Sequence, residues 1–359
     1  MKRLIAPTAA ILATALAAMF AAGLTGQQAM AQEASARFGA KDAPEIRLRS
    51  TTDLDVLGPA IAAFVAQHPD WAVQFDQWGS NLLYDQTLLE CIAESGPKAD
   101  AVISSAVHQM VDLVNRGCAG TYRSDRTAAL SPSLQWRDEV WGITREAAVM
   151  IYNRAGVPEA DVPHTRFALL DLLRPEASPY RGRVSTYDIE QSGLGYLFAY
   201  ADSLEASTFG ALMESFARTG AVATCCSSEI IESVASGDML IAYNILGSYA
   251  QSHADPRVGI VWPEDYTLVL SRGFLLPKGS AQAEGGALLL DFLLSGQGQR
   301  VMAQSGLVAT LDDTEGSNTE ALVPAGALRP IRIEPTLLVA RDAEKRARFL
   351  ARWREVFAR

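Results

Sequence analysis

The feature that most constrains this chain is a repeated change of hydrophobic period across residues 45–90. Residues 46–49 and 72–76 alternate apolar and polar side chains, as half-buried strands do. Each is followed by apolar side chains at helical spacing, around Ile61 and around Leu83. A period that switches from two to about 3.6 and back is typical of βα units on a parallel sheet. We therefore expect polar turns at the strand ends to line one rim of the sheet, where open α/β sheets bind ligands.

The same pattern continues along the chain and indicates two lobes. Residues 101–105 repeat the strand that ends in hydroxyl side chains. Residues 147–152 form an apolar run that also fits a buried helix segment, but their β-branched side chains and the stop at Pro158 favour a crossover strand. The predicted fold class is α/β, with two lobes that each hold a mostly parallel sheet flanked by helices and are joined by crossover strands. The predicted domains are a signal peptide (1–31), lobe 1 (45–145 plus 264–359) and lobe 2 (146–263).

Residues 1–31 have the layout of a secretory signal peptide. Lys2 and Arg3 give a positive start, residues 4–24 are almost entirely apolar, and an A-x-A cleavage site ends at Ala31. A membrane anchor is the alternative interpretation. The small-residue site and the polar, acidic continuation favour cleavage, and no later stretch is long and uncharged enough to span a bilayer. We therefore expect an exported protein located in the periplasm.

The charge balance of the chain is acidic. There are 31 basic and 41 acidic residues, a net charge of −10. Residues 1–31 contain Lys2 and Arg3 and no acids, so their removal leaves 29 basic and 41 acidic residues and a net charge of −12. Nucleic-acid binding requires a basic surface, so we expect no nucleic-acid partner. A small anionic ligand stays compatible with this composition, because helix N-termini and a few arginines act locally.

The four cysteines are Cys91, Cys118, Cys225 and Cys226. An exported chain keeps disulfides, and we predict a Cys91–Cys118 bridge, with free thiols as the alternative. The adjacent Cys225 and Cys226 fit either a vicinal disulfide or two buried thiols at a helix start. Because no His or Cys lies near them at metal-ligand spacing, we expect no metal site and no cofactor.

Sequence motifs for catalysis are missing from the chain. It contains no G-x-S-x-G elbow, no H-E-x-x-H and no P-loop. Of the four histidines, His68, His108, His164 and His253, none pairs with a nucleophile motif. His108 lies nearest a predicted rim, and we interpret it as a solvated surface residue. We therefore expect a protein that is not an enzyme.

Turns that contain hydroxyl side chains or glycine precede five predicted helices, at residues 50–52, 79–80, 104–105, 192–193 and 247–248. One such turn is usually an N-cap, but five of them from both lobes suggest convergence on one cleft that binds phosphate or carboxylate oxygens. Arg145 and Arg272 lie beside the predicted crossover strands and fit charge-assisted bonds to that anion; an ion pair at the hinge is the alternative. The candidate ligand-binding residues are Ser50, Thr51, Thr52, Ser80, Ser104, Ser105, Arg145, Tyr187, Ser192, Gly193, Tyr243, Ser248 and Arg272.

The order of these features resembles a known family. The signal peptide, Ser50-Thr51-Thr52-Asp53, Ser104-Ser105, the crossover at residues 141–153 and Tyr243-Asn244-Ile245-Leu246-Gly247-Ser248-Tyr249 look like a periplasmic solute-binding protein of an ABC importer. The resemblance is to the ferric-iron and sugar-phosphate branch, similar to extracellular solute-binding family 1, and covers about residues 45–306. It implies the two-lobed type II periplasmic-binding-protein fold, hinge closure over the ligand, the membrane subunits of an ABC importer as partners, and a monomer.

The resemblance also bears on the ligand. Iron-binding members have two adjacent tyrosines after the second crossover strand, where this chain reads Gly247-Ser248-Tyr249. A single tyrosine favours a phosphorylated or carboxylated organic anion as the captured solute. Ferric iron remains an alternative, and so does a periplasmic ligand sensor that reports to a histidine kinase.

Overall fold

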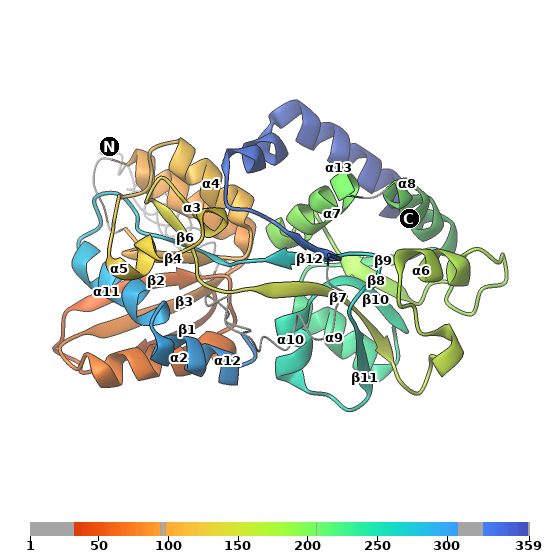
Figure 1. The fold of residues 1–359 in the computed structure, drawn as a ribbon, viewed down its shortest axis with the longest axis horizontal. Coiled ribbons are helices and arrows are strands. Elements are labelled where there is room, and N and C mark those ends of the chain that lie inside the picture. The colour runs from red at the N-terminus through yellow and green to blue at the C-terminus, as the bar shows by residue number, and fades with distance from the viewer. Residues whose placement is uncertain (1–31, 94–95, 97, 206, 308–325, 358–359) are drawn as a thin grey trace, which may run out of the picture.

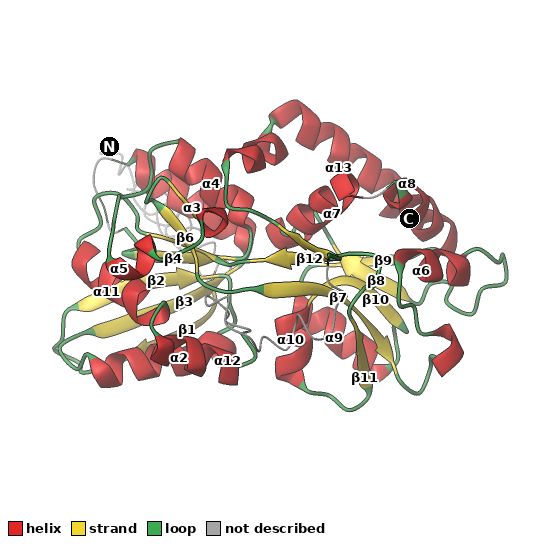
Figure 2. Ribbon diagram, viewed as in Figure 1, coloured by secondary structure: helices red, strands yellow, loops and turns green. Residues whose placement is uncertain are grey.

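The computed structural model describes residues 32–93, 96, 98–205, 207–307 and 326–357. The predicted signal peptide, residues 1–31, lies outside the described residues. The described chain forms two halves side by side, each a sheet flanked by helices (Figure 1 and Figure 2). None of the helices that the structure describes has both the length and the apolar character needed to cross a membrane.

The first half is built on a seven-stranded sheet with the order β1-β3-β2-β4-β13-β6-β5. Strands β2, β3 and β4 run parallel, and β1 pairs antiparallel with β3 at one edge. The elements of this half are β1 (Gln32–Phe38), β2 (Glu45–Ser50), α2 (Leu54–Gln67), β3 (Ala72–Trp78), α3 (Ser80–Ile92), β4 (Ala101–Ser104), α4 (Val107–Asn115), α5 (Asp125–Ala128), η1 (Pro132–Leu134), β5 (Gln135–Trp136), β6 (Val140–Gly142), β13 (Gly273–Leu275), α11 (Ala283–Leu293) and α12 (Gly296–Gln304).

The second half is built on a seven-stranded sheet with the order β14-β12-β7-β10-β8-β9, in which β11 also pairs with β7. Strands β8, β9 and β10 run parallel, and β7 is antiparallel to β10, β11 and β12. The elements of this half are β7 (Glu146–Asn153), η2 (Glu159–Asp161), α6 (Arg166–Leu173), β8 (Val184–Tyr187), α7 (Gly193–Glu205), α8 (Thr208–Thr219), β9 (Val222–Thr224), α9 (Ser227–Ser236), β10 (Ile241–Leu246), α10 (Gly247–His253), β11 (Val258–Val261), β12 (Thr267–Leu270), β14 (Leu328–Pro330) and α13 (Ala343–Phe357). Between β14 and α13, the short helix η3 (Pro335–Arg341) packs on α4 of the first half.

Burial explains why the first strands and helices form where their period predicts them. On β2, Ile46 and Leu48 are fully buried, whereas Arg47 between them is exposed. Helix α2 packs Phe64 into the same core. Strands β2 and β3 are parallel, with Ile46 opposite Val73. The predicted α/β architecture with two sheets is therefore confirmed.

Strand β1 is an element that the sequence does not predict. Its residues are mostly short or charged, so no continuous apolar face marks it as a strand. It is held by backbone pairing along β3, from Ala34 opposite Gln77 to Phe38 opposite Val73. This pairing places Glu33 near the end of β3, at the rim of the sheet.

Strand β7 carries the chain from the first half to the second. All of its residues are buried. Its first residues, Glu146 and Ala147, pair with β12, and its later residues pair with β10 and β11. Strand β12 directly precedes β13 of the first sheet, so it carries the chain back (Figure 1). The predicted crossover strand at residues 147–152 is therefore confirmed.

Both pairs of cysteines form disulfides. Cys91, near the end of α3, is bonded to Cys118, which follows α4, with a Cα–Cα distance of 5.2 Å. This pair confirms the predicted bridge. Cys225 and Cys226 are also bonded to each other, which is the vicinal alternative of the two that the sequence allows.

The C-terminal helix α13 packs on the second half, against α8. Leu350 and Trp353 on its apolar stripe are buried in a cluster with Tyr196 of α7. The predicted boundaries assign residues 264–359 to lobe 1, so α13 differs from that assignment, as do β12 and β14 in the second sheet. The apolar stripe explains the position of α13, because the second half offers it an aromatic surface.

Candidate functional site

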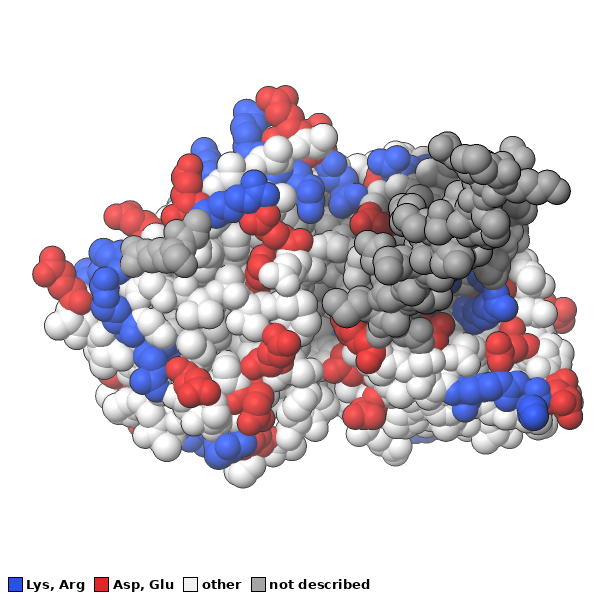
Figure 3. All heavy atoms as spheres, turned by 180° about the vertical axis from the view of Figure 1, so that it is seen from behind, with Lys and Arg blue, Asp and Glu red and all other residues white. Residues whose placement is uncertain are grey.

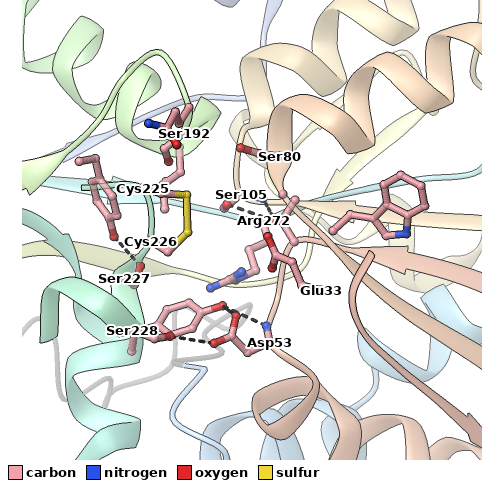
Figure 4. Close-up of a pocket in the computed structure, with 17 residues that line it drawn as sticks. Glu33, Asp53, Ser80, Ser105, Ser192, Cys225, Cys226, Ser227, Ser228 and Arg272 are labelled. Carbon is pink, nitrogen blue, oxygen red and sulfur yellow. Dashed lines mark hydrogen bonds between the residues drawn. A yellow bond between two sulfur atoms is a disulfide. The ribbon is translucent and has the colours of Figure 1, made fainter. Parts of the chain in front are cut away.

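A cavity of about 80 Å³ lies between the two halves. At about 10–15 Å³ of such volume for each water molecule, it has room for roughly five to eight water-sized groups. Side chains from both halves point into it (Figure 4). The residues that line it are Glu33, Thr51, Asp53, Trp78, Gly79, Ser80, Ser105, Tyr187, Gln191, Ser192, Leu194, Cys225, Cys226, Ser227, Ser228, Tyr249 and Arg272.

The polar lining comes from the carboxyl ends of parallel strands. Thr51 follows β2, Ser80 follows β3 and Ser105 follows β4. On the other side, Tyr187 ends β8 and Cys226 comes after β9. In parallel sheets these strand ends meet at one edge. The two edges face each other here, which is why short stretches far apart in the sequence share one cavity.

Hydrogen bonds join the two halves above the cavity. The Ser80 hydroxyl accepts the N–H of Gly193 at 2.8 Å. The Asn81 side-chain amide donates to the carbonyls of Glu190 and Gln191, each at 2.9 Å. Because α3 belongs to the first half and α7 to the second, these bonds hold the halves in a closed arrangement.

Asp53 makes a second set of bonds between the halves. Its carboxylate accepts the hydroxyl of Ser228 at 3.0 Å and that of Tyr249 at 3.1 Å. The Tyr249 oxygen also accepts the backbone N–H of Asp53 at 3.1 Å. Ser228 and Tyr249 begin helices of the second half, whereas Asp53 precedes α2 of the first. Asp53 is therefore a junction of the closed arrangement.

Arg272 brings a positive charge to the wall of the cavity. Its guanidinium donates to the Glu146 carboxylate at 2.8 and 3.0 Å and to the Thr52 hydroxyl at 2.9 Å. Burial lowers the pKa of Arg272, but the interactions with Glu146 and Tyr249 together outweigh burial, and the pKa is raised overall. Glu146 also accepts hydroxyl bonds from Thr144 and Ser248. The ion pair at the hinge, one of the two interpretations of Arg272, therefore exists in the structure.

Carboxylates give the cavity a negative side. Glu33 and Asp53 line it directly, while the charge of Arg272 is balanced by Glu146. Seen from behind, Asp and Glu side chains also flank the visible part of the furrow between the halves (Figure 3). Glu33 is exposed and Asp53 is half-buried, and the Asp53 carboxylate already accepts bonds from Ser228 and Tyr249. Carboxylate oxygens accept several hydrogen bonds each, so this side of the cavity favours ligand groups that donate them.

Two helices, one from each half, begin at the cavity without a side-chain cap. Helix α3 begins at Ser80 after Gly79, and α9 begins at Ser227 after Cys226. Gly79, the N-cap residue of α3, has no side chain, and the side chain of Cys226, the N-cap residue of α9, makes no bond to the first turn of its helix. First-turn N–H groups have no acceptor within the helix, and together with the helix dipole they attract negative groups.

Two buried phenols, Tyr187 and Tyr249, complete the wall. The Tyr187 oxygen lies 2.6 Å from the Ser227 hydroxyl oxygen and accepts the N–H of Leu246 at 3.2 Å. Burial raises the pKa of Tyr187 to about 12 and also raises the pKa of Tyr249. Both phenols are therefore neutral at pH 7. Within the described residues, no three His, Cys, Asp or Glu side chains are placed to share a metal ion.

The structure brings part of the predicted ligand-binding set together at the cavity. Gly193 lies beside the lining, with its N–H bonded to Ser80. Four of the five predicted hydroxyl or glycine turns contribute lining residues, and the turn at Gly247 and Ser248 does not. The predicted residues that line the cavity are Thr51, Ser80, Ser105, Tyr187, Ser192 and Arg272.

Three predicted hydroxyl residues lie beneath the cavity instead. The Ser50 hydroxyl accepts the N–H of Thr52 at 2.9 Å, and the Ser104 hydroxyl accepts the N–H of Ala106 at 3.1 Å. Thr52 is fully buried and supports Arg272. For Ser50 and Ser104 the turn-capping interpretation therefore describes the observed contacts, because their oxygens already accept backbone bonds.

Three further predicted residues lie away from the lining. Tyr243 is in the core of the second half, where its oxygen accepts a bond from Arg166 at 2.7 Å and its hydroxyl donates to Asp202. Ser248 donates to Glu146 at the hinge. Arg145 directly precedes β7 and is half-buried. Tyr243 lies in the middle of β10 and Arg145 lies just outside β7, and neither side chain lines the cavity.

Several lining residues are outside the predicted set. Ser227 and Ser228 carry the same signal as the predicted turns, hydroxyls before a helix, and Asp53 follows the turn at Thr51 directly. Glu33 has no such signal because the sequence does not predict β1. Cys225 and Cys226 carry no sequence signal for ligand binding, although both line the cavity.

His108 differs from its sequence-based interpretation as a solvated surface residue. It is 1% exposed, on α4, and its ring lies 5.5 Å from that of Tyr196. Burial lowers the pKa of His108 well below its usual range, and the positive charges of Arg341 and Arg346 lower it further. The reason is that η3 and α7 cover α4, a contact between distant segments that the local sequence does not show.

The comparisons with known proteins agree with this architecture. A family model described as a bacterial extracellular solute-binding protein matches residues 52–308. No curated protein matches the chain. A solved substrate-binding protein of an ABC transporter from Agrobacterium tumefaciens is 33% identical, with a TM-score of 0.86 over 91% of this chain and 99% of that one.

Two more distant structures share the fold at lower identity. Iron-bound HitA from Pseudomonas aeruginosa is 18% identical, with a TM-score of 0.66 over 87% of this chain and 99% of that one. AfuA from Actinobacillus pleuropneumoniae, solved with fructose-6-phosphate, is 17% identical, with a TM-score of 0.67 over 89% of this chain and 99% of that one. At such identity the likeness extends to the fold alone.

Proposed function

Because the chain belongs to the bacterial extracellular solute-binding proteins of ABC transporters, we propose that it captures a small organic anion between its halves. It then delivers this solute to the membrane subunits of an ABC importer. The protein acts in the periplasm, as a monomer and without a catalytic step. The observation that carries the anion class is the pair of uncapped helix N-termini, α3 and α9, which open on one cavity from opposite halves.

The lining restricts which anion fits. An acidic group placed at the starts of α3 and α9 gains N–H donors and the helix dipoles. The rest of the solute then faces Asp53 and Glu33, which accept hydrogen bonds. A phosphorylated or carboxylated compound with hydroxyl or amino groups satisfies both sides. A compound with acidic groups at both ends would place one of them against Asp53 and lose affinity through repulsion.

Ferric iron is the second candidate, and one observation favours it. Four side chains around the cavity carry oxygen atoms that are suitable metal ligands: Glu33, Asp53, Tyr187 and Tyr249. Against it, burial keeps the phenols protonated, and the Asp53 carboxylate already accepts bonds from Ser228 and Tyr249. Iron would have to displace these protons and bonds. The organic anion needs no such displacement, so we favour it.

A thermal-shift screen tests the proposal. The panel contains glycerol 3-phosphate, fructose 6-phosphate, phosphoserine, glycerate, inorganic phosphate and ferric citrate, and hits are measured by titration calorimetry. A bound solute at 100 times its Kd stabilises the protein by about 2.7 kcal/mol, which gives a clear shift. We expect hits among the hydroxylated or amino-bearing organic acids. A visible absorption band with ferric citrate and no organic hit would support iron instead, and no hit at all would contradict the anion class.

A further inference from the structure

The Cys225–Cys226 disulfide is the part of the cavity wall that the proposed function leaves unused. Both residues line the cavity. The bond faces inward from the second half, between Ser192 and Ser227, and Ser80, Ser105 and Arg272 lie across the cavity from it (Figure 4). The two cysteines connect the end of β9 to the start of α9.

This connection carries the contacts that close the second half onto the first. Cys226 is the N-cap residue of α9, and its side chain makes no capping bond. The next residue, Ser227, bonds to Tyr187, and Ser228 donates to Asp53 of the first half at 3.0 Å. The position of the turn therefore decides whether the Ser228–Asp53 bond forms.

Little else in the sheet fixes the turn. Strand β9 has only three residues, Val222–Thr224, and it is the edge strand of the second sheet, paired to β8 alone. Val222 is exposed. A disulfide between adjacent residues closes a small ring around their peptide bond, which removes backbone freedom that a free pair would have.

The disulfide also differs chemically from the rest of the wall. Most of the lining consists of hydroxyls, carboxylates and one guanidinium, whereas the sulfur atoms are polarisable and form only weak hydrogen bonds. With Leu194, they give the cavity an apolar side. Such a side gains from contact with the C–H face of an organic solute. An inorganic oxyanion has no such face.

We propose that the Cys225–Cys226 disulfide is a ligand-contacting element of this cavity. It fixes the start of α9 in the binding position and packs against the carbon skeleton of the solute. The inference rests on the proposed function and narrows it, because it selects an organic anion with a carbon face over an inorganic one.

A ligand-free experiment tests the positioning. The double variant Cys225→Ala/Cys226→Ala is compared with the parent and with Cys91→Ala/Cys118→Ala, which removes the other disulfide away from the cavity. Hydrogen exchange followed by mass spectrometry should show about tenfold less protection at residues 222–231 in the first variant only. Unchanged exchange there would overturn the positioning role. A collapse of protection along the whole chain would show that the disulfide maintains the fold, and would overturn the proposal as well.

Calorimetry with glycerol 3-phosphate and inorganic phosphate tests the contact, because these probes share the acidic group and differ in the carbon part. We expect the Cys225→Ala/Cys226→Ala variant to lose about tenfold in affinity for glycerol 3-phosphate, and much less for phosphate. The Cys91→Ala/Cys118→Ala variant should bind both like the parent. If the parent and the Cys225→Ala/Cys226→Ala variant bind glycerol 3-phosphate with equal affinity, the proposed contact with the solute is overturned, but the proposed function is not. A parent that binds neither probe nor any other organic acid of the screen would overturn the contact and the proposed function together.

Discussion

Removal of the Asp53 carboxylate should open the protein. The Asp53→Ala variant loses the bonds from Ser228 at 3.0 Å and Tyr249 at 3.1 Å, both of which cross between the halves. The variant keeps the bond in which the backbone N–H of residue 53 donates to the Tyr249 oxygen. Asp53 makes no side-chain capping bond to α2, so the helix itself loses little stability.

The expected magnitude follows from these two bonds. A hydrogen bond to a charged group contributes about 1.5–3 kcal/mol, and the lower value applies because Asp53 is only half-buried. Two such bonds, present only in the closed state, make closure about 3 kcal/mol less favourable. Since the solute is held by the closed state, the apparent Kd should rise roughly 150-fold.

Calorimetric titration of the solute found by screening measures this loss, and small-angle scattering measures closure in the same samples. Asp55→Ala is the matched control, because it removes an exposed carboxylate from the first turn of the same helix. The control should bind like the parent. If Asp53→Ala binds within threefold of the parent, the bonds across the cavity do not hold the closed state and this reasoning is refuted.

Three further changes have expected outcomes. Glu146→Gln leaves the buried Arg272 without its counter-charge, so chemical denaturation should show a loss of about 3–5 kcal/mol; a loss below about 1 kcal/mol would contradict the ion pair. The Cys91→Ser/Cys118→Ser variant removes a bridge that spans 27 residues. On the chain-entropy model its free energy of unfolding should be about 3.5 kcal/mol lower in chemical denaturation. An unchanged free energy of unfolding would show that the bridge does not form. Burial keeps the pKa of His108 well below its usual range, so on acidification His108 is protonated in the unfolded chain before it is protonated in the folded protein. The free energy of unfolding should therefore be full above about pH 6.5 and about 1.4 kcal/mol lower at pH 5.5. The His108→Gln variant should abolish this difference, and a difference that persists in the variant would show that another group causes it.

Local periodicity predicts the central part of the first half, because β2, α2, β3, α3 and β4 each carry their own apolar pattern. Ile46 and Leu48 point into the core and Arg47 points out, and that alternation is visible in four residues. Strand β1 has no such signal, because only its pairing with β3 makes it a strand. The burial of His108 has the same cause, since the segments that cover it are distant in sequence.

The cavity is predictable only to the extent that its residues follow strands. Thr51, Ser80 and Ser105 were expected there because the ends of parallel strands share an edge. The same rule also predicted Ser104, whose hydroxyl instead accepts the N–H of Ala106, since the rule gives the place of a turn and not the direction of each side chain. The prediction that Tyr243 lines the cavity is wrong for the same reason, because its side chain points toward Arg166 in the core.

Native mass spectrometry of the freshly purified protein, expressed in a bacterium from the full sequence with residues 1–31 included, tests most directly whether the cavity binds an organic anion. The parent should carry one small organic acid, seen as a single mass increment that is released on denaturation and identified by fragmentation. The Asp53→Ala variant should carry less of it at the same protein concentration, while Asp55→Ala should carry as much as the parent. An increment of one iron ion, or a parent that carries nothing and takes up no organic acid from the screen, would contradict the claim that the cavity binds an organic anion.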